Sequence, residues 1–124
     1  MTTPPRNSVH DREVFRFLTW AWDITLAHDL TSNSPILTVD ITPLTGFAKL
    51  VAVNPARVAV ADLTRPLLVA PIPDAGNLVI DGWHRIHRAL QEQVTHLPAI
   101  VLTAEDERHC RLRGEITQQR ATRS

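Results

Sequence analysis

The junction between residues 78 and 89 constrains the fold more than any other stretch of the chain. Three apolar residues, Leu78-Val79-Ile80, end at Asp81-Gly82, and an Arg/His-rich helical pattern begins directly afterwards. The first turn of a helix leaves backbone N–H groups without partners, and the helix dipole adds positive charge there. Gly82 allows a sharp turn and a close approach to the backbone, because it has no Cβ. The segment therefore predicts a strand followed by a helix whose start can bind an anion, most often a phosphate.

The composition is that of one globular domain. The chain has 124 residues, 44% of them hydrophobic, which is enough to bury a core. Thirteen basic and thirteen acidic residues give zero formal net charge, whereas a free-standing DNA-binding protein usually has a basic excess. The single cysteine, Cys110, excludes an internal disulfide. Because no transmembrane run or signal peptide is recognisable, the sequence predicts a cytoplasmic protein with no membrane partner.

The pattern along the chain predicts an α+β fold, a small mixed β-sheet flanked by helices. Residues 1–10 are expected to form a flexible arm and residues 114–124 a polar tail, which leaves 11–113 as a single domain. Apolar spacings of three and four residues predict an N-terminal helical extension over 11–30. Strands are expected over 36–41, 67–72, 78–80 and 97–102, and further helices over 43–50, 54–63, 83–93 and 103–114.

The expected N-terminal helix is unusually aromatic. Phe15, Phe17, Trp20 and Trp22 cannot all lie on one helical face. Such a helix would either be buried on two sides or present aromatic side chains to a partner. The second alternative predicts a homodimer through this helix.

The five residues from Asp81 to Arg85, Asp-Gly-Trp-His-Arg, resemble the motif that opens a helix in the ParB/sulfiredoxin superfamily. They are most similar to the Asp-Gly-His-His-Arg form of ADP-dependent free-serine kinases, with Trp83 in place of the first histidine. Residues 65–69 resemble the proline box of that superfamily, and residues 95–102 resemble the strand after its motif helix. The resemblance spans 65–102 and implies a ParB/sulfiredoxin-like domain that binds a nucleotide (ATP, ADP or CTP) together with Mg²⁺.

The resemblance implies a phosphate-binding set around Gly82. The backbone of Gly82 and the side chains of His84 and Arg85 would contact the phosphates, with Arg85 using the paired donors of its guanidinium. Arg65, just before the proline box, would reach the same group. The residues alone also allow the plainer interpretation, in which Gly82 only permits the turn and both arginines lie in solvent.

Three further residues near the motif have two interpretations each. His87, one helical turn after His84, would make a second phosphate contact or lie on the surface. Trp83 would stack on a nucleobase or cover the edge of the sheet. Asp81 would coordinate Mg²⁺ or cap the helix. Asp81, His84 and His87 together are also a candidate transition-metal set, although no fourth ligand is evident.

The chemistry implied by the resemblance is phosphoryl transfer to a small-molecule acceptor or nucleotide hydrolysis. Asp81 and His84 are the candidate catalytic residues, and Asp40 and Asp62 are the carboxylates to test as general base. Sulfiredoxin chemistry is excluded, because Trp83 stands where that family has its catalytic cysteine. Two alternatives remain: a DNA-associated partition or nuclease module, disfavoured by the zero net charge, and a non-catalytic protein-interaction domain.

Overall fold

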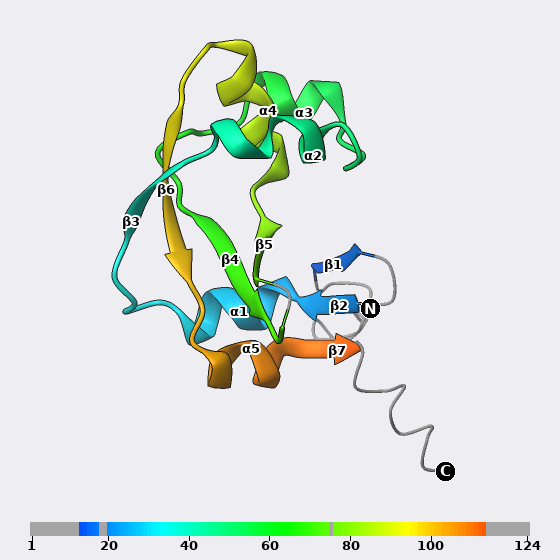
Figure 1. The fold of residues 1–124 in the computed structure, drawn as a ribbon, viewed down its shortest axis with the longest axis vertical. Coiled ribbons are helices and arrows are strands. Elements are labelled where there is room, and N and C mark those ends of the chain that lie inside the picture. Colours follow the sequence, from blue (N-terminus) through cyan, green and yellow to red (C-terminus); the bar gives the residue numbers. More distant parts are fainter. Residues whose placement is uncertain (1–12, 18–19, 75, 114–124) are drawn as a thin grey trace, which may run out of the picture.

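The computed structural model describes residues 13–17, 20–74 and 76–113, which form an α+β fold with two β-sheets (Figure 1). The predicted arm (1–10) and polar tail (114–124) lie outside the described residues. No helix in the described ranges is long and apolar enough to span a bilayer.

The larger sheet has four strands in the order β3-β6-β4-β5 and carries the motif. Strand β4 (Leu67–Ile72) pairs antiparallel with β5 (Gly76–Asp81) and parallel with β6 (His96–Val101), while β3 (Leu37–Asp40) runs antiparallel to β6. A parallel pair needs a crossover connection, and here β5 and helix α4 (Trp83–Gln91) provide it. The predictions of a mixed sheet and of a helix directly after β5 are confirmed.

The smaller sheet corrects the N-terminal prediction. Strand β2 (Trp20–Asp23) pairs antiparallel with β1 (Val14–Phe17) and with β7 (Arg111–Arg113). The prediction of a helix over 11–30 is therefore wrong where β1 and β2 form. Among the residues of this range that the structure describes, only α1 (Ile24–Leu30) is helical. It begins where the Asp23 side chain accepts a hydrogen bond from Leu26 N at 2.9 Å. Aromatic residues favour strands, where they pack against cross-strand neighbours.

The N-terminal aromatic residues pack against one another and against the cores, and Trp22 is the one that is buried. The ring of Phe15 stacks on Trp22 and that of Trp22 on Trp20, with centroids 6.2 and 5.7 Å apart. Trp22 is fully buried, and its indole N–H donates to Glu107 at 2.9 Å. The aromatic helix expected to form a homodimer therefore does not exist, and the homodimer itself stays a prediction.

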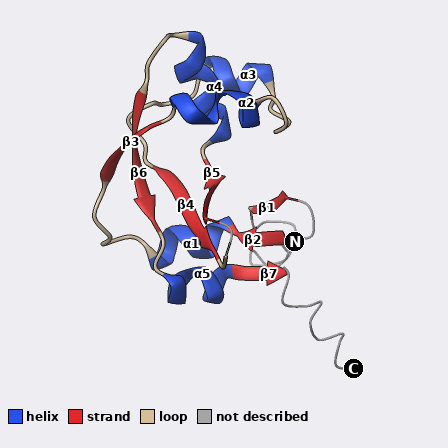
Figure 2. Cartoon of the chain, viewed as in Figure 1, coloured by secondary structure: helices blue, strands red, loops and turns tan. Residues whose placement is uncertain are grey.

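The remaining helices are short. They are the 3₁₀ helix η2 (Thr42–Leu44), α2 (Thr45–Ala48), α3 (Pro55–Ala59) and α5 (Ala104–Cys110). Side chains cap α3 and α5, since Asn54 accepts from Ala56 N and Thr103 from Asp106 N. Helices α3 and α5 end earlier than expected. Figure 2 shows α2, α3 and α4 grouped at one end of the larger sheet and α1 and α5 at the other.

The central strand β4 is buried on both faces. Leu67 and Val69 pack into a core with Trp83 and other residues beneath α2 and α4, whereas Leu68 and Ala70 pack into a second core beside α1 and α5. Successive strand residues point to opposite faces, so one strand fixes both cores. The end of β5 and the start of α4 are thereby held in a defined place.

Candidate anion-binding site

The turn into α4 requires glycine. Gly82 has a φ of 113°, in the left-handed region, and it is the N-cap residue of α4. A Cβ built on Gly82 would lie 2.4 Å from Cδ2 of the buried Leu67. The chain therefore passes too close to β4 for any side chain. Because glycine has no side chain to offer, α4 begins without a side-chain cap.

A cavity of about 340 Å³ opens at this corner. Residues from the end of β5, the start of α4 and the beginning of β1 line it, together with residues 51–52, Arg57 of α3, residues 60–62 and Arg65. Its charged side chains are those of Glu13, Arg57, Asp62, Arg65, Asp81 and Arg85, and its apolar ones include Val14, Phe15, Val51 and Val60. The volume lies at the lower end of the range for small-ligand pockets, about 300–1,000 Å³. The corner is therefore open to a ligand.

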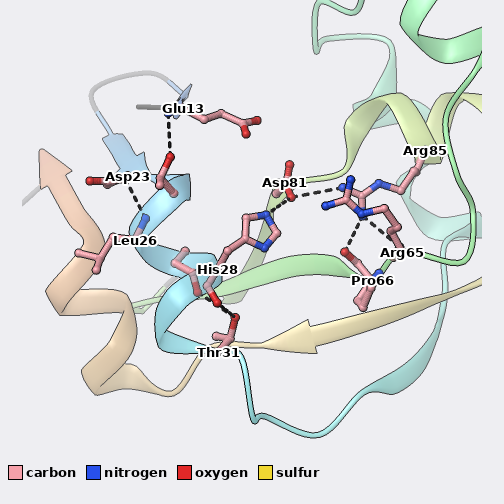
Figure 3. Close-up of polar contacts among 11 residues, drawn as sticks. Glu13, Asp23, Leu26, His28, Thr31, Arg65, Pro66, Asp81 and Arg85 are labelled. Atoms are coloured by element: carbon pink, nitrogen blue, oxygen red, sulfur yellow. Dashed lines mark hydrogen bonds and ion pairs between the residues drawn. The ribbon is translucent and has the colours of Figure 1, made fainter. Parts of the chain in front are cut away.

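Arg85 is held by the protein. Its Nη1 donates to the backbone oxygen of Arg65 at 3.0 Å and to that of Pro66, and its Nη2 lies 3.3 Å from Asp81 Oδ2 (Figure 3). The Arg85 side chain is 11% exposed, so the interpretation that it lies in solvent is wrong. Most of its donors already serve the fold, although it still lines the cavity.

Asp81 has two side-chain partners on one oxygen. Its Oδ2 accepts a hydrogen bond from His28 Nε2 at 2.9 Å and faces Arg85, so Asp81 does not cap α4. Burial raises the pKa of Asp81, but the His28 hydrogen bond and the charges of Arg85 and His28 outweigh it and lower the pKa overall. The carboxylate is therefore ionised at neutral pH. Its Oδ1 makes no hydrogen bond or ion pair with the described part of the chain.

Two histidines of α4 hold neighbouring elements. His84 Nε2 accepts from Asn54 N at 3.1 Å, so its proton is on Nδ1. Burial, followed by the nearby charge of Arg57, lowers the pKa of His84, and the ring is neutral at pH 7. His87 donates from Nε2 to the backbone oxygen of Ala48 at 3.0 Å and does not line the cavity. The phosphate contact predicted for His87 is wrong for this geometry.

Trp83 belongs to the core. Its side chain is 4% exposed, its indole N–H donates to Val79 O at 2.8 Å, and its ring packs against Phe47 with centroids 5.4 Å apart. The ring faces are therefore closed to a nucleobase, and the stacking interpretation is wrong. The plainer interpretation, in which the indole covers the sheet, describes this residue.

Sequence reasoning missed three residues near the site: Arg57, Glu13 and His28. Arg57 and Glu13 line the cavity, and His28 binds Asp81 from α1. The side chains of Arg57, Arg65 and Glu13 make no hydrogen bond or ion pair with the residues described here. No local motif marks Arg57 or Glu13, because α3 and β1 reach the site only through tertiary folding.

The two candidate general bases lie in different places. Asp62 lines the cavity and accepts from the backbone and hydroxyl of Thr64, which lower its pKa. Asp40 ends β3, accepts from Thr42 N and does not line the cavity. Asp40 is therefore excluded as a base at this site.

The transition-metal interpretation is wrong. Asp81, His84 and His87 face different partners, and within the described ranges no group of three or more His, Cys, Asp or Glu side chains gathers to hold a metal. Magnesium bound mostly by phosphates needs only one or two protein carboxylates. The open Oδ1 of Asp81 fits that smaller requirement.

Comparison with known proteins gives no relative: no protein family, no curated protein and no solved structure matches the chain. Assignment of a function therefore depends on the chemistry of the cavity and on the motif that opens α4.

Proposed function

We propose that this chain is a ParB/sulfiredoxin-like domain that binds a nucleotide, with the phosphates at the start of α4. The observation that supports this most strongly is the combination of an open cavity, an uncapped helix start and two arginines without hydrogen-bonded partners in the described chain. An uncapped helix start presents N–H donors and positive potential to an anion.

Arg57 and Arg65 are the phosphate-binding side chains in this proposal. Both line the cavity beside α4, and neither guanidinium makes a hydrogen bond or ion pair with the described residues. Arginine offers forked donors that match phosphate oxygens. The Nδ1–H of neutral His84 adds one more donor, because Nε2 is occupied by Asn54. Arg85 has the supporting role of fixing the cavity wall.

The apolar part of the cavity lining suits the body of a nucleotide. Val14, Phe15, Val51 and Val60 supply apolar surface, and Val60 is 77% exposed. Covering such surface with a base or a ribose removes it from water, which contributes about 25 cal/mol per Å². A nucleotide should therefore bind more tightly than a bare polyphosphate.

Phosphoryl transfer or nucleotide hydrolysis is the reaction that this arrangement supports best. Bound magnesium would neutralise phosphate charge and would be held by Asp81 Oδ1 together with the phosphate oxygens. Asp62 and Glu13 are the carboxylates in the cavity that can accept a proton from an acceptor or water. In this proposal Asp81 is a magnesium ligand, and His84 donates a hydrogen bond to the phosphates.

Calorimetric titration with ATP, ADP, CTP and pyrophosphate, with and without Mg²⁺, tests the proposal. We expect saturable binding of at least one nucleotide below millimolar concentration, tighter than pyrophosphate and tightened by Mg²⁺. Adenosine and cytidine are matched controls without phosphate and should bind at least tenfold more weakly, about 1.4 kcal/mol. Absence of binding of every phosphate compound at millimolar concentration would remove the proposed function.

A further inference from the structure

His28, which lies outside the motif, is the nearest partner of Asp81. It lies in the last turn of α1, and its Nε2 is 2.9 Å from Asp81 Oδ2, against 3.3 Å for Arg85 Nη2 (Figure 3). Both partners bind the same oxygen, Oδ2. Because a carboxylate oxygen accepts hydrogen bonds, His28 Nε2 is the donor of this pair.

The helix that carries His28 is fixed at both ends. Asp23 caps its start through Leu26 N, and Thr31 Oγ1 donates to Ala27 O at 2.8 Å near its end (Figure 3). Ile24 and Ala27 are fully buried beneath it. His28 is thus presented from a packed element, as a side chain that orients a ligand group must be.

We propose that His28 is a positioning residue that holds Asp81 by Oδ2, so that Oδ1 is directed to a divalent cation bound with the phosphates of the ligand. This inference rests on the proposed function. Magnesium requires near-octahedral oxygen geometry at about 2.0–2.1 Å, so a carboxylate free to rotate is a poorer ligand. Hydrogen-bonded partners of metal ligands orient them, and removing such a partner typically costs 10–100-fold in metal affinity.

A purely structural role would be different. His28 would then only join α1 to the end of β5, and its loss would lower stability without changing cation binding. Its side chain is 40% exposed, so its substitution leaves no large cavity in a core. The two roles therefore separate when cation affinity and thermal stability are measured on the same variants.

Two substitutions of His28 make a matched pair. In His28→Gln the amide nitrogen is as many bonds from Cα as Nε2 is, so it can still donate to Asp81. In His28→Asn the nitrogen is one bond closer to the backbone and cannot reach. His109→Ala, an exposed histidine of α5 outside the cavity, controls for loss of an imidazole.

The experiment measures Mn²⁺, an octahedral substitute for Mg²⁺, by electron paramagnetic resonance of the full chain with saturating pyrophosphate. His28→Asn should weaken Mn²⁺ binding by about tenfold or more, while His28→Gln and His109→Ala remain within about twofold of the wild type. Metal-free pyrophosphate affinity should be the same in all four proteins.

Other outcomes overturn the inference. If wild-type protein binds pyrophosphate but no Mn²⁺, or if His28→Asn binds Mn²⁺ as well as the wild type, His28 does not position a cation ligand and the phosphate site survives. If His28→Asn and His28→Gln lose Mn²⁺ affinity equally, His28 does not position Asp81 through this hydrogen bond. If the wild type binds no pyrophosphate or nucleotide at all, the proposed function fails and this inference fails with it.

Discussion

Two walls of the cavity carry arginines in opposite states. On the wall formed by α4 and β4, Arg85 binds the backbone oxygens of Arg65 and Pro66 and faces Asp81. On the open wall, formed by α3 and the segment that leads into β4, the guanidinium groups of Arg57 and Arg65 make no hydrogen bond or ion pair with the described chain. The fold uses Arg85, whereas Arg57 and Arg65 keep their donors available. We call the wall of Arg85 the committed wall and that of Arg57 and Arg65 the open wall.

The committed wall also fixes the open one. Arg88 of α4 donates to the backbone oxygens of Ala59 and Ala61, at the end of α3, as Arg85 does to Arg65 and Pro66. The two arginines together hold the segment from Ala59 to Pro66 against α4. If the cavity binds an anion, the motif therefore acts indirectly, by holding Arg57 and Arg65 in place beside it. Each prediction below tests whether the two walls differ in this way.

The largest expected effect is on the committed wall, at Gly82. In Gly82→Ala a Cβ would meet Leu67 Cδ2 at 2.4 Å, and alanine would have to adopt a φ of 113°. Left-handed backbone costs about 1–2 kcal/mol and overpacking about 1–3 kcal/mol. We therefore expect a loss of about 3 kcal/mol in the free energy of unfolding, measured by urea denaturation. Gly46→Ala is the control, since nothing lies within 4 Å of its Cβ. An unchanged stability of Gly82→Ala would show that this corner is loosely packed.

Arg85→Ala should lower stability by about 2 kcal/mol, because two backbone oxygens and the carboxylate of Asp81 lose their donor. Arg108→Ala, an exposed arginine of α5, should change it by less than about 0.5 kcal/mol. Thermal and urea denaturation measure both. If Arg85→Ala is as stable as Arg108→Ala, the guanidinium is not committed to the fold, and the contrast between the walls fails.

The committed wall could largely be predicted from sequence, because its signals are local. The apolar run, Asp81-Gly82 and the helical pattern after it lie within 12 residues, and β5 and α4 follow them closely. The contacts that decide what each motif residue does are not local. Arg85 binds residues 19 and 20 positions earlier, and His28 reaches Asp81 across 53 positions.

The N-terminal error had a signal that could have been used. Phe15 and Phe17, and then Trp20 and Trp22, alternate with a period of two, which is typical of strands. Spacings of three and four among neighbouring apolar residues obscured that alternation. The choice between the two periods was made by tertiary pairing with β7, which follows α5 at the far end of the domain. Glu13, on the cavity, came to the site with β1 and could not be placed without this pairing.

On the open wall, Arg57→Ala and Arg65→Ala should each weaken nucleotide or pyrophosphate binding about tenfold, or about 1.4 kcal/mol, with stability within about 0.5 kcal/mol of the wild type. Each loses donors to phosphate without losing a hydrogen bond to the described protein. Calorimetry on the variants, with Arg108→Ala as control, measures this. If the variant with both substitutions, Arg57→Ala and Arg65→Ala, keeps full affinity, the anion binds elsewhere in the cavity.

The smallest expected effect is on the acid stability of the two walls. Asp81 has a pKa below its ordinary value of 3.8, because the His28 hydrogen bond and Arg85 outweigh its burial. Its ionised form therefore stabilises the fold above pH 3.8, and this stabilisation is lost as the pH falls through the lower folded value. Asp81→Asn should be less stable than the wild type at neutral pH, with the difference shrinking under acid.

Asp62 provides the comparison on the open wall. Its pKa is also lowered, by the Thr64 hydrogen bonds, but it is exposed to solvent, where such interactions contribute little to stability. Urea denaturation from about pH 6 to pH 2.5 should show a pH-dependent difference from the wild type that is clear for Asp81→Asn and small for Asp62→Asn. The reverse order would mean that Asp62, not Asp81, is the carboxylate committed to the fold, and Asp81 would then be free to act as the base.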